Sequence, residues 1–335
     1  MTAAVAPRRV GIDVGGTKAL GIVLDATGAV VDEQRRATPR GDDSLDPLVD
    51  VLVELASSLA PSIGADDSVG IGVPGLVTRS GVLRAAPNLD GVADLDVRGR
   101  VAAAFDDARR PDVAVDNDAT CATVAEWRLG AAVGSDHVML ITLGTGIGGG
   151  VVANGRVVRG VNGFAGEFGH MVVDPNGPRC PCGRRGCWER YASGSGLAML
   201  AREAATGRRL QGVVEAAGGA QAVTGEHVRD AARTGDAEAI AVIDDFARWV
   251  ALGLTNLTNA FDPEVLVLGG GLATGADLYL EPISRWYARL LYQPHLRPLP
   301  RIEFATWGDR AGAVGAALLP GLRSNPSPTG ATEGS

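Results

Sequence analysis

The most constraining feature of the sequence is an internal duplication. Residues 10–13 (Val-Gly-Ile-Asp) align with residues 139–142 (Met-Leu-Ile-Thr) at an offset of 129 positions, and at the same offset Gly15 aligns with Gly144. Each copy has the pattern of an apolar strand, a glycine turn and a second apolar strand. A repeat at that distance predicts two domains of common design, each with a glycine hairpin. If the hairpins face each other across a cleft, they could hold a chain of phosphates from both sides.

The segments around these hairpins alternate between strand and helix patterns, which is typical of an α/β fold. The clearest helix spans residues 45–59, where leucines recur at spacings of three and four, with Ser44 as N-cap and Pro47 in the first turn. The other predicted helices cover residues 97–108, 119–129, 197–205, 226–233, 240–261 and 311–318. The predicted strands outside the second hairpin cover residues 10–12, 19–24, 29–37, 69–73, 112–115 and 265–268.

Composition and charge exclude several classes of function. The 335 residues suffice for about two domains, and the 47 glycines, about twice the average share, indicate tight turns and close approach of the backbone to ligands. A net charge of −8 argues against sequence-independent binding of nucleic acid. The N-terminus has no apolar signal core, and no uncharged apolar run reaches the ~20 residues of a membrane span. We therefore expect a cytoplasmic protein with reduced thiols and with neither nucleic acid nor membrane as partner.

The turn of the first hairpin carries groups that suit a phosphate. Gly15 and Gly16 let main-chain amides approach an anion, Thr17 supplies a hydroxyl and Lys18 a positive charge. Asp13 is out of place beside a phosphate unless a magnesium ion lies between them. A tight hairpin that binds nothing accounts for the same pattern, so this motif alone leaves both interpretations open.

Two further glycine motifs have a nucleotide interpretation. Residues 144–149 match the G-x-G-x-x-G fingerprint of dinucleotide-binding folds, but that fingerprint needs a helix next. Instead, Asn154 and Gly155 form a turn between β-branched runs, so the dinucleotide interpretation fails on context. The glycine triplet 269–271, after the strand at 265–268, either admits a flat ligand such as adenine or only turns the chain.

A polar cluster of Asp116, Asn117 and Asp118 lies between the predicted strand 112–115 and a helix. Ligands usually meet an α/β sheet at the carboxyl ends of its strands. Asp118 is therefore a candidate catalytic carboxylate. Any of the three side chains could instead be the helix N-cap, and we expect that one of them is.

Three of the four cysteines and one histidine fall in the Gly- and Pro-rich stretch 167–189. His170, Cys180, Cys182 and Cys187 make the four-ligand set of a structural zinc site. Because protein fills all four positions, no place is left for an activated water, and the metal should organise the loop rather than take part in the chemistry. Three thiols cannot all pair with one another as disulfides. A chance grouping of these residues in a turn is the alternative.

The two ends of this stretch are acidic. A metal in the loop would fix Glu167 and Glu189 in space, where they could hold a polyhydroxylated substrate. The fourth cysteine, Cys121, lies in an apolar run after Asp118, where a buried free thiol is expected.

With these motifs together, the sequence resembles the ROK family of bacterial repressors and sugar kinases, and most closely its glucokinases. The resemblance spans residues 9–320. It rests on DVGGTK at 13–18, NDA at 117–119, LGTGIGGG at 143–150, and EFGH with CPCGRRGCWERYASG at 167–170 and 180–194. It implies an α/β, actin-like ATPase (ribonuclease H-like) fold of two similar domains around a cleft, with a zinc-clipped loop. The implied parts are a small domain of residues 8–118 plus 309–322 and a large domain of 119–308 with the sugar site and zinc loop. From its polar composition the tail 324–335 is expected to be disordered, as is the start 1–7.

The resemblance also implies an activity, the transfer of the γ-phosphoryl group of ATP to the 6-hydroxyl of glucose, which gives glucose 6-phosphate. ATP, Mg²⁺ and structural Zn²⁺ would be the cofactors, Asp118 the general base, and a homodimer or homotetramer the assembly. The implied sugar ligands are Gly75, Asn117, Asp118, Glu167, His170 and Glu189. The implied ligands of the nucleotide and its phosphates are Asp13, Gly15, Gly16, Thr17, Lys18, Thr145, Gly146 and Gly270.

Other functions fit the same motifs. The ROK family includes sugar-sensing repressors, which carry a DNA-binding segment ahead of the sugar domain, whereas only 12 residues precede Asp13 here. The acceptor could be N-acetylmannosamine, fructose or another hexose. The phosphoryl donor could be polyphosphate, although a long anion would call for more basic walls.

Overall fold

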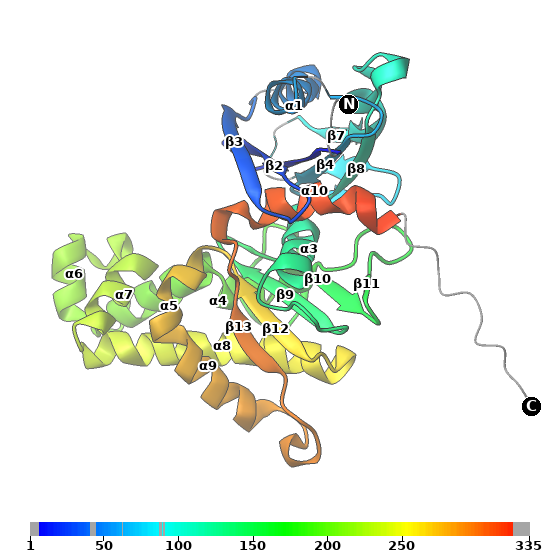
Figure 1. Ribbon diagram of the computed structural model, residues 1–335. Helices are drawn as coiled ribbons and strands as arrows, with labels where there is room; N and C mark the ends of the chain where they lie inside the picture. Colours follow the sequence, from blue (N-terminus) through cyan, green and yellow to red (C-terminus); the bar gives the residue numbers. More distant parts are fainter. Residues whose placement is uncertain (1–6, 41–44, 62, 87–88, 90, 324–335) are drawn as a thin grey trace, which may run out of the picture. The chain divides into compact units, whose positions relative to one another are not determined.

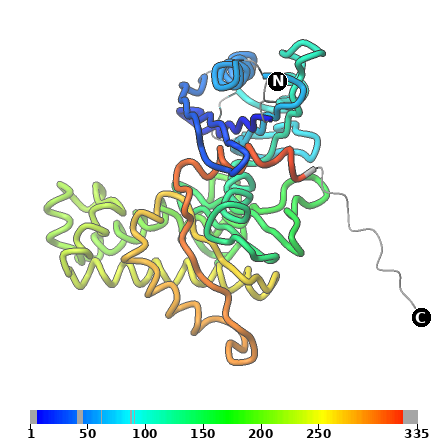
Figure 2. The backbone as a smooth tube through the Cα atoms, in the orientation of Figure 1, coloured from blue at the N-terminus to red at the C-terminus, as the bar shows by residue number. Residues whose placement is uncertain are grey.

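The computed structural model describes residues 7–40, 45–61, 63–86, 89 and 91–323, and Figures 1 and 2 trace the chain through them. The expected disorder of residues 1–7 and 324–335 concerns, apart from Pro7, residues outside this description. The predicted helix cap Ser44 lies outside it as well.

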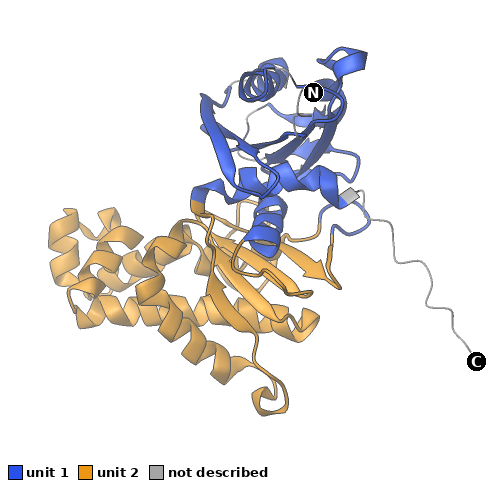
Figure 3. Ribbon diagram, in the orientation of Figure 1, with its two compact units in different colours: residues 1–129, 159–164, 309–335 blue, residues 130–158, 165–308 orange. Residues whose placement is uncertain are grey.

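The chain forms two compact units (Figure 3). Unit 1 consists of the residues up to 129, residues 159–164 and the residues from 309 on, and unit 2 consists of residues 130–158 and 165–308. The sequence placed residues 119–129 and 159–164 in the larger domain, and this division places both with unit 1. The reason for the first difference is that the helix at 118–129 packs on the last helix of the chain, which belongs to unit 1.

Unit 1 is built on a five-stranded sheet with the order β3-β2-β1-β4-β8. Strand β2 is antiparallel to both β1 and β3, and β4 and β8 continue the sheet in parallel with β1. The strands are β1 (Arg9–Val14), β2 (Lys18–Leu24), β3 (Val30–Ala37), β4 (Ser68–Val73) and β8 (Asp112–Asn117).

Unit 2 repeats this sheet, with the order β11-β10-β9-β12-β13. The two hairpins are again antiparallel, and β12 and β13 again run parallel to β9. Its strands are β9 (Val138–Leu143), β10 (Ile147–Ala153), β11 (Arg156–Val157), β12 (Val265–Gly269) and β13 (Arg301–Phe304). Strand order and direction therefore confirm the internal duplication, with β1 and β2 corresponding to β9 and β10.

The helices of unit 1 are α1 (Leu45–Leu59), α2 (Val97–Ala103), α3 (Asp118–Leu129) and α10 (Ala311–Arg323). A small sheet that the sequence did not predict joins β5 (Leu76–Val77), β6 (Val82–Ala85) and β7 (Ala93–Asp96). Helix α2 ends five residues before the predicted Ala108. Acidic residues suit the start of a helical turn rather than its end, and Asp106 and Asp107 accordingly begin a separate 3-10 turn.

The helices of unit 2 are α4 (Glu189–Ala192), α5 (Gly194–Thr206), α6 (Gln211–Ala217), α7 (Gly225–Arg233), α8 (Ala237–Phe261) and α9 (Ala276–Leu290). The 3-10 turns of the described chain are η1 (Asp107–Arg109), η2 (Phe168–His170), η3 (Ala220–Ala222), η4 (Gly271–Gly275), η5 (Pro294–Leu296) and η6 (Gly308–Arg310). Each unit has its own apolar core, and in unit 2 much of that core is the buried face of α8. No helix in the described part of the chain is long and apolar enough to cross a membrane.

Glycines allow α10 to pack closely on its neighbours within unit 1. A Cβ added at Gly70 of β4 would lie 1.6 Å from the carbonyl oxygen of Ala316, and one at Gly315 would lie 1.6 Å from that of Cys121 in α3. Real Cβ atoms do not approach this closely, so backbone meets backbone at both positions. The run of small residues in α10 is therefore a packing surface for the sheet and for α3.

We predict that Gly315→Ala destabilises unit 1, because the added methyl group overlaps the backbone of α3 and forces the helices apart. Overpacking of this kind costs about 1–3 kcal/mol or more. Gly321→Ala is the matched control in the same helix, because its Cβ would meet nothing within 4 Å. Urea denaturation should show a lower midpoint for Gly315→Ala and a nearly unchanged one for Gly321→Ala. Equal midpoints for the two variants would contradict the packing argument.

Candidate functional site

In unit 1, two carboxylates lie near each other at the carboxyl end of the sheet. Asp13 is the next-to-last residue of β1, and Asp118 is the first residue of α3, directly after β8. Burial raises the pKa of Asp13 to about 7, and the negative charge of Asp118 acts in the same direction. A Cβ at Gly312 would come within 2.4 Å of the Asp13 carboxyl carbon, so the start of α10 covers this acid closely. A divalent cation would relieve the repulsion between the two acids.

Asn117 provides the helix cap that the sequence left open among three residues. Its Oδ1 accepts the backbone N–H groups of Ala119 (2.9 Å) and Thr120 (3.2 Å). Its Nδ2 donates to the carbonyl of Gly75 at 3.1 Å, where a φ of +111° favours glycine. The structure therefore brings Gly75 and Asn117 together beside Asp118. Asp116 points elsewhere and pairs with Arg159.

The turn of the first hairpin is held by main-chain and side-chain contacts. The N–H of Gly15 donates to the carbonyl of Lys18 at 2.9 Å, and the hydroxyl of Thr38 donates to the carbonyl of Gly15 at 2.7 Å. Thr17 and Lys18 are exposed and accessible to a ligand. Arg40 donates to the carbonyl of Gly16 at 3.3 Å and adds a positive charge that the sequence analysis missed. No motif contains Arg40, so only the fold places it here.

In unit 2, the second hairpin is bonded to a candidate sugar ligand. The Gly144 N–H donates to the carbonyl of Gly146 at 3.0 Å and closes the turn. The Ile147 N–H donates to Oε2 of Glu189 at 2.9 Å. A Cβ at Gly146 would lie 2.4 Å from that oxygen, so the carboxylate lies directly against the turn. This contact joins the glycine hairpin to the acidic end of the cysteine-rich loop.

The four expected metal ligands lie together. The ligand atoms of His170, Cys180, Cys182 and Cys187 are all within 4.8 Å of one another. The Sγ atoms of Cys182 and Cys187 are 3.5 Å apart, and Cys180 Sγ is 3.9 Å from His170 Nδ1. A tetrahedral zinc with Zn–S bonds of about 2.3 Å needs ligand atoms about 3.8 Å apart, so the residues present fit this metal. The 3.5 Å separation is also too long for a disulfide.

The loop that carries these ligands is fixed at its C-terminal end by Trp188. This side chain is fully buried, and its indole N–H donates to the carbonyl of Trp249 in α8 at 2.8 Å. A Cβ at Gly253 would lie 1.9 Å from the indole ring, so a glycine in α8 makes room for it. The bridge between Val172 and Cys187 ties the two ends of the loop. Glu189, directly after Trp188, is thereby held in place.

His170 connects the metal cluster to the acidic residues. Its Nδ1 faces Cys180, while its Nε2 lies 3.9 Å from Oε2 of Glu167. Burial raises the pKa of Glu167; His170 nearby opposes the rise, and the charge of Glu189 adds to it. Glu167, His170 and Glu189 therefore form one group of donors and acceptors, as suits the hydroxyls of a sugar.

Unit 2 also has a cavity of about 600 Å³, in the size range of small-molecule sites. Its walls combine glycine backbone, polar side chains and apolar side chains. The lining residues are Gly144, Thr145, Gly194, Ser195, Leu197, Ala198, Arg202, Thr224, Gly225, Glu226, Arg229, Gly271, Leu272 and Tyr279. Of the expected nucleotide ligands, Thr145 is in the wall. Gly270 adjoins the wall residue Gly271 and packs on Leu143, where a Cβ would be 2.7 Å from the backbone.

Two buried polar atoms in this cavity wall lack hydrogen-bond partners among the described residues. They are Oη of Tyr279, whose residue is 2% exposed, and Nε of Arg229, which lies 4.0 Å from Oδ1 of Asp230 in an ion pair. A buried polar group without a partner costs free energy, so such groups mark places where a ligand completes the bonding. The sequence analysis missed both residues. The only signal for Tyr279 is its position shortly after a glycine-rich turn, which does not distinguish it from a core residue.

The sequence of the chain matches the ROK family over residues 9–321. A glucokinase of Streptomyces coelicolor is 36% identical over 317 residues, which cover 92% of this chain and 96% of the relative. An N-acetyl-D-glucosamine kinase of Pectobacterium atrosepticum is 38% identical over 323 residues, covering 92% of this chain and 97% of the relative.

Solved structures agree with these relatives. The crystal structure of a ROK family glucokinase from Streptomyces griseus, in complex with glucose and AMPPNP, matches with a TM-score of 0.77 at 34% identity. The match covers 92% of this chain and 98% of that one. Together with the repeated strand order of the two sheets, this match confirms the expected actin-like ATPase fold.

We predict that Cys182→Ser abolishes tight zinc binding, because hydroxyl oxygen is a poor substitute for a thiolate in a tetrahedral site. Cys121→Ala is the control, since Cys121 is buried in unit 1 outside the cluster. Elemental analysis should find about one zinc per chain in the wild type and in Cys121→Ala, and little in Cys182→Ser. Hydrogen exchange of residues 171–187 should be faster in Cys182→Ser alone. Full zinc content in that variant would refute the site.

We predict that Asp13→Asn makes the chain more stable above neutral pH. An Asp whose pKa is about 7 when folded and 3.8 when unfolded binds more protons in the folded state between these values. Stability is therefore lost as pH rises through this window, by up to about 4 kcal/mol. Asn carries no charge and escapes this loss. Urea denaturation from pH 5 to 8, without added magnesium, should give a flatter profile for Asp13→Asn. Parallel profiles would contradict the burial of an ionised Asp13.

Proposed function

Because the chain belongs to the ROK family, we propose that it is a sugar kinase that transfers the γ-phosphoryl group of ATP to the 6-hydroxyl of glucose. The relatives support a sugar kinase in general. Glucose is the proposed acceptor because glucokinases are among the relatives and because the Streptomyces griseus glucokinase structure contains glucose together with AMPPNP.

The observation that carries this proposal is the hydrogen bond from Ile147 N–H to Glu189. It joins a glycine hairpin, which suits phosphates, to the group of Glu167, His170 and Glu189, which suits sugar hydroxyls. Within unit 2, the candidate site for the sugar, which accepts the phosphoryl group, and the candidate site for the phosphates of its donor are therefore joined by one contact. A phosphoryl-transfer enzyme needs this proximity, because its main task is to align two oxygens about one phosphorus.

The cavity of unit 2 supports a nucleotide as the donor. Polyphosphate has neither a base nor a ribose, and it would leave the buried hydroxyl of Tyr279 in the cavity wall without a hydrogen-bond partner. A nucleoside offers a flat apolar face and polar edges to such a wall. We therefore propose ATP rather than polyphosphate.

Asp118 is the proposed general base. It is the first residue of α3, and its Oδ1 accepts the Ala119 N–H at 2.8 Å. It would take the proton of the sugar hydroxyl late, after the oxygen begins to bond to phosphorus, so that a weak base suffices. Asp13 is the proposed Mg²⁺ ligand, because a carboxylate suits this ion, which would supply positive charge to the donor phosphates.

A second acceptor has specific support. The relative with 38% identity is an N-acetyl-D-glucosamine kinase, so a 2-acetamido sugar is a competing acceptor. Glucose and N-acetylglucosamine share the 6-hydroxyl, and they differ only at the 2-position. N-acetylmannosamine and fructose are further candidate acceptors.

A coupled assay of ADP release tests the function. The wild type is assayed with ATP and each of the four sugars, and then with glucose and polyphosphate by direct detection of glucose 6-phosphate. The proposal expects the highest kcat/KM for glucose with ATP. A higher value for N-acetylglucosamine would overturn the acceptor and retain the kinase. Absence of turnover with every sugar, together with sugar-dependent DNA binding in a gel-shift assay, would favour a regulator.

We predict that Asp118→Asn lowers kcat by a factor of about 10² to 10⁴, which is the usual contribution of a general base. Asn retains the oxygen that accepts the Ala119 N–H, so folding and sugar binding should survive. Asp112→Asn, at the exposed opposite end of β8, is the matched control and should behave like the wild type. Near-normal turnover by Asp118→Asn would remove the base from the mechanism.

A further inference from the structure

Residues 159–164, here called the strap, are a short piece of unit 1 between two long stretches of unit 2. The chain leaves unit 2 after Val158, contributes the strap to unit 1, and returns to unit 2 at Ala165. Three residues after the end of the strap comes Glu167, a proposed sugar ligand. The strap is therefore the piece of unit 1 that precedes Glu167 in the chain.

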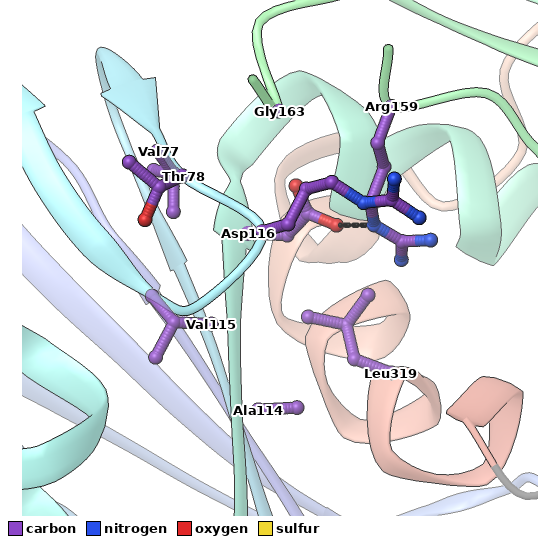
Figure 4. A pocket seen from close by; sticks show the side chains of 9 residues that line it. Val77, Thr78, Ala114, Val115, Asp116, Arg159, Gly163 and Leu319 are labelled. Carbon is purple, nitrogen blue, oxygen red and sulfur yellow. Dashed lines mark hydrogen bonds and ion pairs between the residues drawn. The ribbon is translucent and has the colours of Figure 1, made fainter. Parts of the chain in front are cut away.

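One ion pair is the principal attachment of the strap. Nε of Arg159 donates to Oδ2 of Asp116 at 2.6 Å, and the Asp116 side chain is only 6% exposed (Figure 4). The remaining contacts are weaker. Val161 is 86% exposed and a cavity of about 150 Å³ lies beside the strap, so that of its large apolar side chains only Phe164 is partly buried. Gly163 abuts the carbonyl of Val77, where a Cβ would be 2.3 Å away, but it has no side chain to anchor.

The same carboxylate also supports the proposed sugar site. Oδ1 of Asp116 accepts the backbone N–H of Asn117 at 3.0 Å. Asn117 in turn bonds to Gly75 and caps α3, the helix that begins at Asp118. The buried Asp116 carboxylate therefore accepts a hydrogen bond from Arg159 of the strap with one oxygen and from the backbone of Asn117 with the other.

After the strap, the chain packs closely against unit 2 from Gly166 on. Gly166 has a φ of +109°, and a Cβ there would lie 2.3 Å from the carbonyl oxygen of Gly149 in β10. Gly163, with a φ of +100°, is seated on unit 1 in the same way. Only Phe164 and Ala165 lie between these two glycines. Glu167 therefore directly follows a glycine that packs against β10.

From these contacts we propose that Arg159 is a positioning residue for the sugar site, acting through the Asp116 carboxylate. It pairs with the carboxylate that accepts the Asn117 N–H, so that the position of this proposed sugar ligand depends on one ion pair. This inference rests on the proposed sugar-binding role of Asn117. Arg159 itself need not touch the substrate.

The central test is Arg159→Met, which keeps much of the length of the side chain and removes its charge. Asp116 is then left buried and unpaired, and it should turn toward water and release Asn117. Displacements of about 1 Å in positioned groups cost up to about 10²-fold in rate, so we expect hexose KM to rise and kcat to fall, each about tenfold or more. The KM for ATP should stay within about twofold, because no residue of the strap lines the proposed nucleotide cavity.

Arg79→Met is the matched control. Arg79 lines the same small cavity but is exposed, and its replacement should leave the kinetic constants unchanged. Arg159→Lys retains the charge and should recover part of the hexose affinity. Asp116→Asn should resemble Arg159→Met. The double variant that combines them should be no worse than either single one, because no unpaired buried charge remains.

The readouts separate positioning from folding. Hexose affinity is also measured directly, by calorimetric titration with glucose in the absence of ATP, and melting temperatures are recorded for every variant. A lower melting temperature with unchanged hexose affinity and kcat in Arg159→Met would overturn the proposal, and so would an equal loss in Arg79→Met. If the wild type binds glucose without phosphorylating it, the kinase proposal fails, while the dissociation constants still decide the role of Arg159. If the wild type binds no hexose, both are overturned.

Discussion

The hydrogen bond between the Ile147 N–H and the Glu189 carboxylate is the contact on which the candidate site of unit 2 depends. It requires a glycine at position 146, because any Cβ there would collide with the carboxylate. Glu189 must also be held in place. The preceding residue, Trp188, does this through the hydrogen bond from its buried indole to α8. The metal cluster adds a third restraint by fixing His170 toward Glu167. Glycine backbone, aromatic packing and the cluster of candidate metal ligands thus meet at one small group of side chains.

In unit 1, the candidate site contains buried and closely spaced carboxylates. Burial raises the pKa of Asp13, and the nearby charge of Asp118 raises it further. Such an arrangement lowers the stability of the folded chain at neutral pH, and proteins retain it where it serves a function. Asn117 and Asp116 offset part of the cost by capping α3 and by pairing with Arg159. Asp118 therefore lies beside a local network of hydrogen bonds.

The elements that the sequence predicted well are those with strong local patterns. The two glycine hairpins, the leucine-rich helix α1 and the long helix α8 all have apolar residues at regular spacing. The small sheet of β5, β6 and β7 was missed because its strands have only two to four residues, too few to show a period. Helix α9 was missed for another reason. It contains Pro282, which normally interrupts a helix, and charged residues separate its apolar positions.

For the candidate site, local sequence was enough to identify the kinds of chemistry. Three cysteines and a histidine in one loop identify the metal ligands, and glycines between strands identify the hairpins, because these signals lie within a few residues of one another. The folded chain was needed to show which of Asp116, Asn117 and Asp118 caps the helix, and that Arg159 pairs with a carboxylate 43 positions away. The fold alone placed Tyr279 and Arg229 in one cavity wall. The physical reason is that spacing along the chain determines local geometry, whereas contacts between distant residues follow from how the sheets and helices pack.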